Sequence, residues 1–176
     1  IEFAYKGNKW HIFQCRYLPN LTKGTEDKEI KEVLINLEKK IKNLQNKNPH
    51  LSGKTTIFSN MSDWNPAEMI GNKPKPLAIS LYSELITNRI WGIQRKEYGY
   101  KDVSPNILMV NLAGTPFIDL RTDINSFLPS NLDNKISEKI SNNSIKTLEK
   151  KPFLHDKIEF DLLLTCFDFD INYKKI

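Results

Sequence analysis

Three polar side chains near the start of the sequence have the types and the spacing of a nucleotide-binding cluster. The apolar and polar alternation around Gly7 predicts two strands joined by a tight hairpin turn. Gln14 and Arg16 would share one face of this hairpin, and Glu2 would join them across the ladder. A carboxylate can hold Mg²⁺ and a guanidinium can fork onto the phosphate oxygens of a nucleoside triphosphate. An exposed strand face with unrelated polar residues explains the same pattern, and geometry alone favours that explanation.

A second dense segment, Ser59–Gly71 (SNMSDWNPAEMIG), reads as a strand-to-helix junction. Asp63 or Asn65 would cap the helix that follows, and Trp64 would anchor it by packing. Glu68 would lie in the first turn, where the helix dipole favours a carboxylate. Capping and packing explain most of this segment without chemistry, so Glu68 is the residue of the segment that we would mutate first for function.

The remaining patterns predict the elements that position these residues. Strands are expected over 1–5, 9–17 and 54–59, on both sides of a turn at Ala113–Pro116, and as a long final strand over 156–171. A first helix is expected from Thr25, with the apolar stripe Ile30, Leu34, Leu37, Ile41 and Leu44. A second is expected from Pro76 to about Lys96, with an apolar face formed by Leu77, Leu81, Leu85 and Ile86. A third is expected after a cap at Asp133. The loop around Pro49 and Gly53 is the best candidate for a linker.

These elements predict an α+β fold, in which an N-terminal β-hairpin and helix precede a mixed module of antiparallel strands and two or three helices. The net charge of +5 comes from lysines that are spread among acids, which argues against a nucleic-acid partner. No stretch predicts a membrane span. Cys15 and Cys166 lie far apart in apolar patterns, which predicts small core residues and a reducing cytoplasm. The start at Ile1 without a methionine suggests a piece of a longer protein.

The hairpin sequence IEFAYKGNKWHIFQCRYLP resembles the closing hairpin of the ATP-grasp, nucleotide-binding domain of phosphoenolpyruvate synthases and pyruvate phosphate dikinases. That family has Asp-Ile-Glu-aromatic, a turn with glycine, and then Gln-x-Arg-Pro. The resemblance places Glu2, Gln14 and Arg16 on ATP-binding positions, with Glu2 as the metal ligand, and implies ATP and Mg²⁺ as cofactors. The match departs from the family at Leu18, since the family has proline directly after the arginine.

The later segment NPAEMIGNKPKPLAISLY is similar to the start of the middle, acceptor-side region of phosphoenolpyruvate synthase-like proteins and rifampicin phosphotransferases. The motifs SDWNPAE, PLA, SLY and LIT, a Gly-Tyr pair and an Asp-x-Arg strand also resemble uncharacterised phosphoenolpyruvate synthase-like proteins, some from surface-polysaccharide gene clusters. The resemblance implies three domains: residues 1–19 as the ATP-grasp hairpin, 20–53 as helix and linker, and 54–176 as the middle domain.

Within this middle domain, polar residues are candidates for binding a polar or phosphorylated acceptor. Asp119 and Arg121 would share a strand face, where they could also simply pair with each other. Arg121 is the better candidate for an anion because its planar fork matches a phosphate or carboxylate. The full candidate set is Glu68, Arg89, Arg95, Asp119, Arg121 and His155.

The expected function is therefore part of a phosphoenolpyruvate synthase-like, ATP-dependent phosphotransferase that is inactive alone. The chain would supply the edge of the ATP/Mg site and an acceptor-side module, with a small phosphorylated or carboxylate substrate and the remaining domains of the longer protein as partners. The alternative is a non-catalytic module that binds a carbohydrate or a protein, in which Trp64 would stack on a sugar ring.

Overall fold

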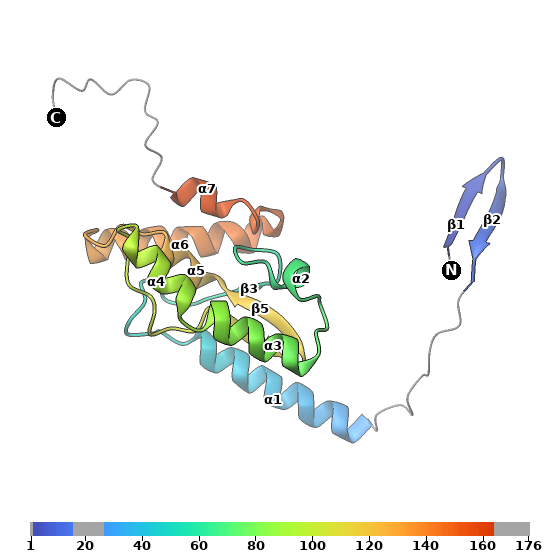
Figure 1. Ribbon diagram of the computed structural model, residues 1–176, viewed down its shortest axis with the longest axis horizontal. Helices are drawn as coiled ribbons and strands as arrows, with labels where there is room; N and C mark the ends of the chain where they lie inside the picture. The colour runs from blue at the N-terminus through green and yellow to red at the C-terminus, as the bar shows by residue number, and fades with distance from the viewer. Residues whose placement is uncertain (1, 16–26, 164–176) are drawn as a thin grey trace. The chain divides into compact units, whose positions relative to one another are not determined.

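The computed structural model describes residues 2–15 and 27–163 (Figure 1). They form antiparallel sheets of two and three strands together with helices, so the predicted α+β class is confirmed. The chain divides into two compact units, Ile1–Ile35 and Asn36–Ile176. None of the helices in the described ranges is long and apolar enough to cross a membrane.

The first unit contains the predicted hairpin, with β1 (Glu2–Lys6) antiparallel to β2 (Lys9–Gln14). Gly7 and Asn8 form the turn, with φ values of 59° and 61°. Two successive positive φ values are the signature of a type I′ turn, whose twist matches that of the flanking strands. The hairpin prediction is thus confirmed, although Cys15 just after β2 is exposed and not the core residue that the sequence predicts.

Helix α1 (Asp27–Gln45) begins in the first unit and ends in the second. The predicted start at Thr25 lies outside the described residues. The predicted stripe becomes more buried along the helix, because Ile30 and Leu34 are exposed whereas Ile41 and Leu44 are partly buried. The second half of α1 therefore packs on the unit in which its carboxyl end lies.

The sheet of the second unit has the strand order β3-β5-β4, with both pairs antiparallel. Its strands are β3 (Phe58–Ser59), β4 (Met109–Leu112) and β5 (Thr115–Asp119). The predicted turn between β4 and β5 is confirmed: Ala113 and Gly114 have φ values of 52° and 85°. The strand predicted over 54–59 is present only at its last two residues.

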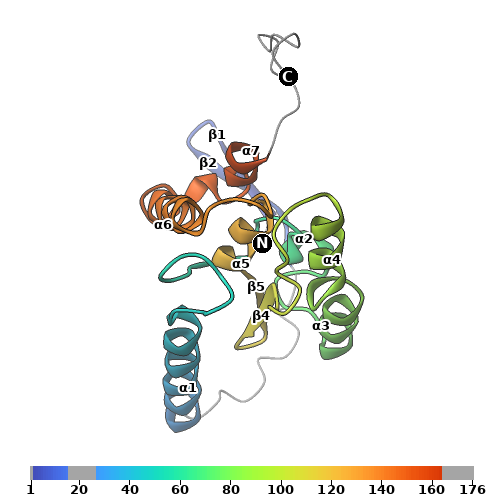
Figure 2. The same cartoon turned by 90° about the vertical axis from the view of Figure 1, so that its left-hand side faces the viewer.

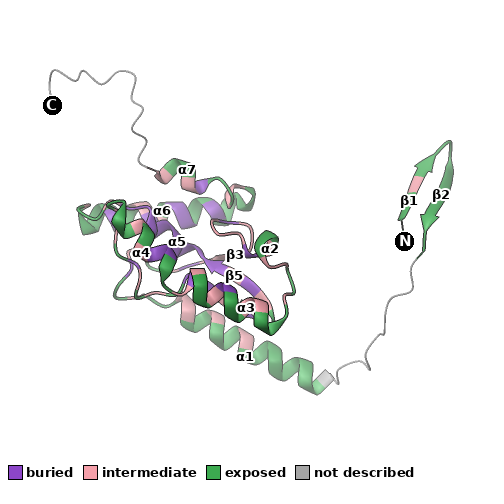
Figure 3. Cartoon of the chain, in the orientation of Figure 1, coloured by how far each residue is buried: buried purple, intermediate pink, exposed green. Residues whose placement is uncertain are grey.

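The helical segments of the second unit surround this sheet. In chain order they are α2 (Pro66–Met69), α3 (Pro76–Tyr82), the π-helix η1 (Ser83–Thr87), α4 (Ile90–Glu97), α5 (Leu120–Ser126), α6 (Asn134–Lys150), the 3₁₀ turn η2 (Pro152–Leu154) and α7 (Ile158–Leu162). Two views place α5 and β5 between α6 on one side and the α3–α4 segment on the other (Figures 1 and 2). Every residue of α5 is buried, as its colour shows (Figure 3).

The single helix predicted from Pro76 is interrupted by the π-helix η1 and by a break before α4. The apolar face predicted there is largely exposed, because Leu77, Leu81 and Leu85 are 77%, 55% and 60% exposed. The buried side carries Tyr82 and Trp91 instead. A π-turn adds one residue per turn, which rotates the following residues out of the register that a continuous α-helix would give.

The final strand predicted over 156–171 is wrong for its first part, which forms helix α7. Ile158 and Leu162 are four residues apart, so the helix puts both against the core while Phe160 points outward and is 66% exposed. Alternation over a few residues therefore did not distinguish a strand from a short helix. Residues from 164 onward, including Cys166, lie outside the described residues.

The loop after α1, predicted as a linker, is packed into the second unit. Leu51 is 5% exposed and belongs to the core. Ser52, which follows Leu51, is bound through both of its backbone groups by Asn125 of α5. The Asn125 Oδ1 atom accepts from Ser52 N at 2.8 Å, and its Nδ2 atom donates to Ser52 O at 2.9 Å. The domain boundaries at 19 and 53 stay predictions.

Candidate functional site

Asp119 stands where strand β5 ends and helix α5 begins, and its side chain joins the two. Its Oδ1 accepts hydrogen bonds from Thr122 N at 3.0 Å and from Thr56 Oγ1 at 2.7 Å. The first bond caps α5, and the second ties the cap to the loop before β3. Burial raises the pKa of this carboxyl above its ordinary value, and the two hydrogen bonds oppose that rise.

The sequence predicts that Arg121 and Asp119 share a strand face, and this prediction is wrong. The chain turns into α5 directly after Asp119, so Arg121 lies in the helix. Its Nη1 and Nη2 atoms donate to Asn46 O at 2.9 Å and to Leu44 O at 3.0 Å. The guanidinium thus caps the carboxyl end of α1, where unpaired carbonyls favour a cation. Burial lowers the pKa of Arg121, which is only 2% exposed.

A cavity of about 610 Å³ lies beside this junction, within the second unit. Its charged lining consists of Lys40, Lys47 and Arg121 with one acid, Asp119. The amides of Asn46, Asn48 and Asn106 also line it. Three cations against one carboxylate give the lining an excess of positive charge, which makes the cavity suitable for a small anion.

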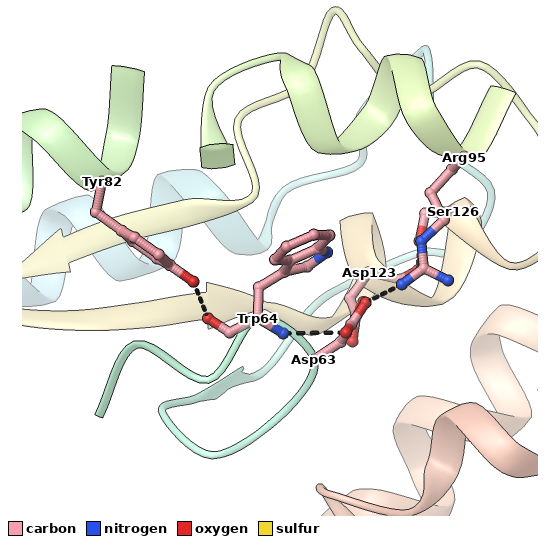
Figure 4. Close-up of polar contacts among 6 residues, drawn as sticks. All are labelled: Asp63, Trp64, Tyr82, Arg95, Asp123 and Ser126. Carbon is pink, nitrogen blue, oxygen red and sulfur yellow. Dashed lines mark hydrogen bonds and ion pairs between the residues drawn. The ribbon is translucent and has the colours of Figure 1, made fainter. Parts of the chain in front are cut away.

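A second polar cluster joins the segment before α2 to α4 and α5 (Figure 4). Asp63 accepts from Trp64 N at 3.0 Å and forms an ion pair with Arg95. The Arg95 guanidinium also lies 4.0 Å from the centre of the Phe127 ring. Figure 4 shows Asp63 between Trp64 and Arg95, with Asp123 of α5 close by. The cluster is therefore built from three segments that are distant in sequence.

Asp123 is the most strongly perturbed group of this cluster. It is 1% exposed, and among the described residues its Oδ1 atom has no hydrogen-bond partner. Burial first, and then the nearby Asp63, raise the pKa of Asp123 well above its ordinary value, while Arg95 opposes the rise. Burial also raises the pKa values of Asp63 and Glu159. The charge of the Arg95 guanidinium opposes the rise at all three of these acids.

The hairpin brings together two of its three predicted residues. Glu2 and Gln14 are direct cross-strand partners, so their side chains lie on the same face of the ladder. Arg16 lies outside the described residues. Glu2 and Gln14 are both exposed.

The other predicted site residues are dispersed. Glu68 is exposed in the first turn of α2, whose cap is Asn65: its Oδ1 accepts from Glu68 N at 3.1 Å. Arg89 is exposed before α4. His155 contacts Ser59, and in the described ranges no group of three or more His, Cys, Asp or Glu side chains is placed to hold a metal ion.

Sequence reasoning missed Asp123, Thr56 and Ser59 as members of polar clusters. The signal for Asp123 was only partial: of the residues three and four positions away, Leu120 and Phe127 are apolar, but Asp119 and Ser126 are polar. For Thr56 and Ser59 no sequence signal existed, because their partners lie 63 and 96 residues away.

Comparison with protein-family models, with curated proteins and with solved structures gives no match. The resemblance to phosphoenolpyruvate synthase-like proteins therefore stays a prediction.

Proposed function

We propose that this chain is part of a phosphoenolpyruvate synthase-like, ATP-dependent phosphotransferase. Residues 1–19 would form one edge of the ATP/Mg site, and the second unit would serve as the acceptor-side module. The observation that supports this proposal best is the cross-strand pairing of Glu2 with Gln14, because it puts a carboxylate and an amide on one face of the hairpin.

The residues present fit a Mg²⁺–nucleotide complex in their chemistry. Mg²⁺ prefers oxygen ligands, and the Glu2 carboxylate is one. When bound, the ion neutralises charge on the phosphates during transfer. Glu2 would hold the ion, Gln14 would contact a neighbouring polar group, and Arg16 would grip phosphate oxygens. The proposal requires further residues of an ATP-grasp domain from the longer protein.

The cavity beside α5 is the proposed place for a small phosphorylated or carboxylate acceptor. Arg121 already donates to two backbone carbonyls, so it would act there mainly through its charge. Lys47 reaches the same cavity from an exposed position and would contact the anion directly. This revises the sequence-based preference for Arg121 as the anion-binding residue.

The test is the affinity of the longer protein for Mg-ATP, measured by isothermal titration. Glu2→Ala and Arg16→Ala should each weaken binding about tenfold or more, which is the effect of losing about 1.4 kcal/mol. Glu84→Ala, which removes an exposed acid from η1, is the matched control and should leave the affinity unchanged. Unchanged affinity in both hairpin variants would reject the assignment.

For the alternative, a non-catalytic module, the surroundings of Trp64 are informative. The indole is partly buried and packs against the core. The backbone carbonyl of Trp64 accepts a hydrogen bond from Tyr82 Oη at 2.5 Å (Figure 4). These contacts favour a packing role over stacking on a sugar ring. The protein-binding version keeps support from the exposed side chains of Leu77 and Leu81 on α3.

A further inference from the structure

Ser59 and His155 form a hydroxyl–imidazole pair that the proposed phosphotransferase function does not use. Ser59 is the last residue of β3, and His155 directly follows the 3₁₀ turn η2. The Ser59 Oγ atom lies 2.7 Å from His155 Nδ1, although the two residues are 96 positions apart. This distance is that of a strong hydrogen bond, and it is the first requirement for a serine that an imidazole activates.

The pair lies on the wall of a separate cavity of about 150 Å³. The rest of the wall combines the polar Asn60 with apolar residues, which are Ile57, Phe58, Phe117, Leu120, Leu148 and Pro152. Drug-sized ligands need roughly 300–1,000 Å³, so this cavity suits only a small group. A few polar atoms in an apolar cavity are typical of a site that orients a small ligand.

The second hydrogen bond of Ser59 leaves its hydroxyl hydrogen available to the imidazole. Its Oγ atom accepts from Met61 N at 3.3 Å, and the residue is only 7% exposed. In the tautomer of His155 that carries its proton on Nε2, Nδ1 is an acceptor, and the hydroxyl donates to it. The proposal uses this tautomer, because it is the one in which His155 can take the hydroxyl proton.

We propose that Ser59 and His155 are a nucleophile and general base that accept a small acyl group from an activated ester in this cavity. Ser59 Oγ attacks the carbonyl carbon while its proton passes to His155 Nδ1. The bond from that carbon to the leaving oxygen breaks, and the leaving group takes the electron pair. The imidazolium then loses its proton to solvent, which leaves acyl-Ser59 and a neutral His155.

Water completes the cycle by hydrolysis. A water molecule attacks the acyl carbon and gives one proton to His155 Nδ1. The bond from the acyl carbon to Ser59 Oγ breaks, and Oγ regains a proton from the imidazolium. One ester and one water are consumed, and one acid and one alcohol are formed, with no change in oxidation state. The substrate class is an ester of a short, apolar acyl group.

The experiment treats the full chain with 4-nitrophenyl acetate, whose leaving group departs without needing a proton. Release of 4-nitrophenolate is followed by absorbance, and the acetylated residue is found by peptide mass mapping. We expect acetylation of Ser59 in the original chain and none at this position in Ser59→Ala. His155→Ala should slow acetylation about 100-fold, the lower end of what a general base contributes, and added imidazole should restore it.

His155→Asn separates chemistry from packing. An asparagine amide can accept the hydrogen bond of Ser59 but cannot take its proton, so this variant should keep the fold and acetylate about 100-fold more slowly, as His155→Ala does. Ser52→Ala is the matched control, since the Ser52 hydroxyl accepts from Lys101 Nζ at 2.9 Å and is not the partner of a histidine ring in the described hydrogen bonds; it should acetylate as the original chain does. Acetyl groups on lysines only, or full acetylation of Ser59 in His155→Asn, would overturn the proposal.

Discussion

The N-terminal hairpin and the β5–α5 junction each contain polar residues that the sequence marks as binding candidates, but they place them in opposite surroundings. Glu2 and Gln14 are exposed on a two-stranded ribbon. Asp119 and Arg121 are 5% and 2% exposed, and their side chains hold helix ends. Polar side chains of the same kinds are therefore accessible to solvent in one region and hold the architecture in the other.

The physical reason for this difference is desolvation. A buried charge must find hydrogen-bond partners within the protein, and the nearest partners are backbone groups at helix ends. An exposed carboxylate remains hydrated and can exchange water for a metal ion or a phosphate-bound ion. Burial of a polar candidate thus argues first for a structural role, and the comparison predicts different consequences of mutation.

The largest effect on stability is expected from Arg121→Ala. It leaves two backbone carbonyls without their charged donors, and each such hydrogen bond contributes about 1.5–3 kcal/mol, so we expect a loss of about 3 kcal/mol or more. Urea unfolding followed by the fluorescence of the buried Trp91 measures it. Glu2→Ala is the control from the other region and should change the free energy of unfolding by less than about 0.5 kcal/mol.

Arg121→Lys sharpens the same comparison. An ammonium lacks the planar fork, so it should reach one carbonyl well and recover only part of the loss. A loss below about 1 kcal/mol in Arg121→Ala would show that water in the adjoining cavity satisfies the carbonyls, and the architectural role of this residue would then be minor.

An intermediate effect, dependent on pH, is expected from Asp123→Asn. Burial and Asp63 raise the pKa of Asp123 well above its ordinary value, so the folded state binds the proton more tightly than the unfolded chain does. The stabilisation that Asp123 gives the folded state is fully present below its ordinary pKa, and it is lost as the pH rises through the raised pKa. The asparagine does not titrate, so the variant should be more stable than the original chain at neutral pH.

Urea unfolding at several pH values between about 4 and 8 measures this difference. Burial also raises the pKa values of Asp63 and Glu159, so these two acids likewise make the folded state less stable as the pH rises. An unchanged pH dependence in Asp123→Asn would assign the effect to those two acids.

The smallest effect is expected from Asn65→Ala at the start of α2. The side chain accepts from Glu68 N at 3.1 Å, and loss of such a cap costs about 1 kcal/mol. Glu68→Ala on the same helix removes an exposed carboxylate and should cost less than about 0.5 kcal/mol. Thermal unfolding of both variants measures the stability that each side chain contributes, and it compares the capping Asn65 with the exposed Glu68 in the same segment. Equal costs would mean that Glu68, too, has a structural role.

Local features of the fold were predictable from the sequence. The hairpin turn at Gly7, the turn at Gly114 and the helix caps at Asn65 and Asp133 all appear where the residue types predict them. Each depends on a dihedral preference or a hydrogen bond within three residues. The helical face from Leu77 and the first part of the final strand were wrong, because a π-helix and a short helix depend on packing that sequence periodicity does not report.

The sequence by itself determined the α+β class, the hairpin that pairs Glu2 with Gln14, and the positions of turns and caps. Only the tertiary structure decided which polar residues are buried and which of them meet. Arg121 meets the end of α1 and Ser59 meets His155, across 75 and 96 positions of the chain. Such contacts depend on how helices and strands pack together, and no local preference encodes them.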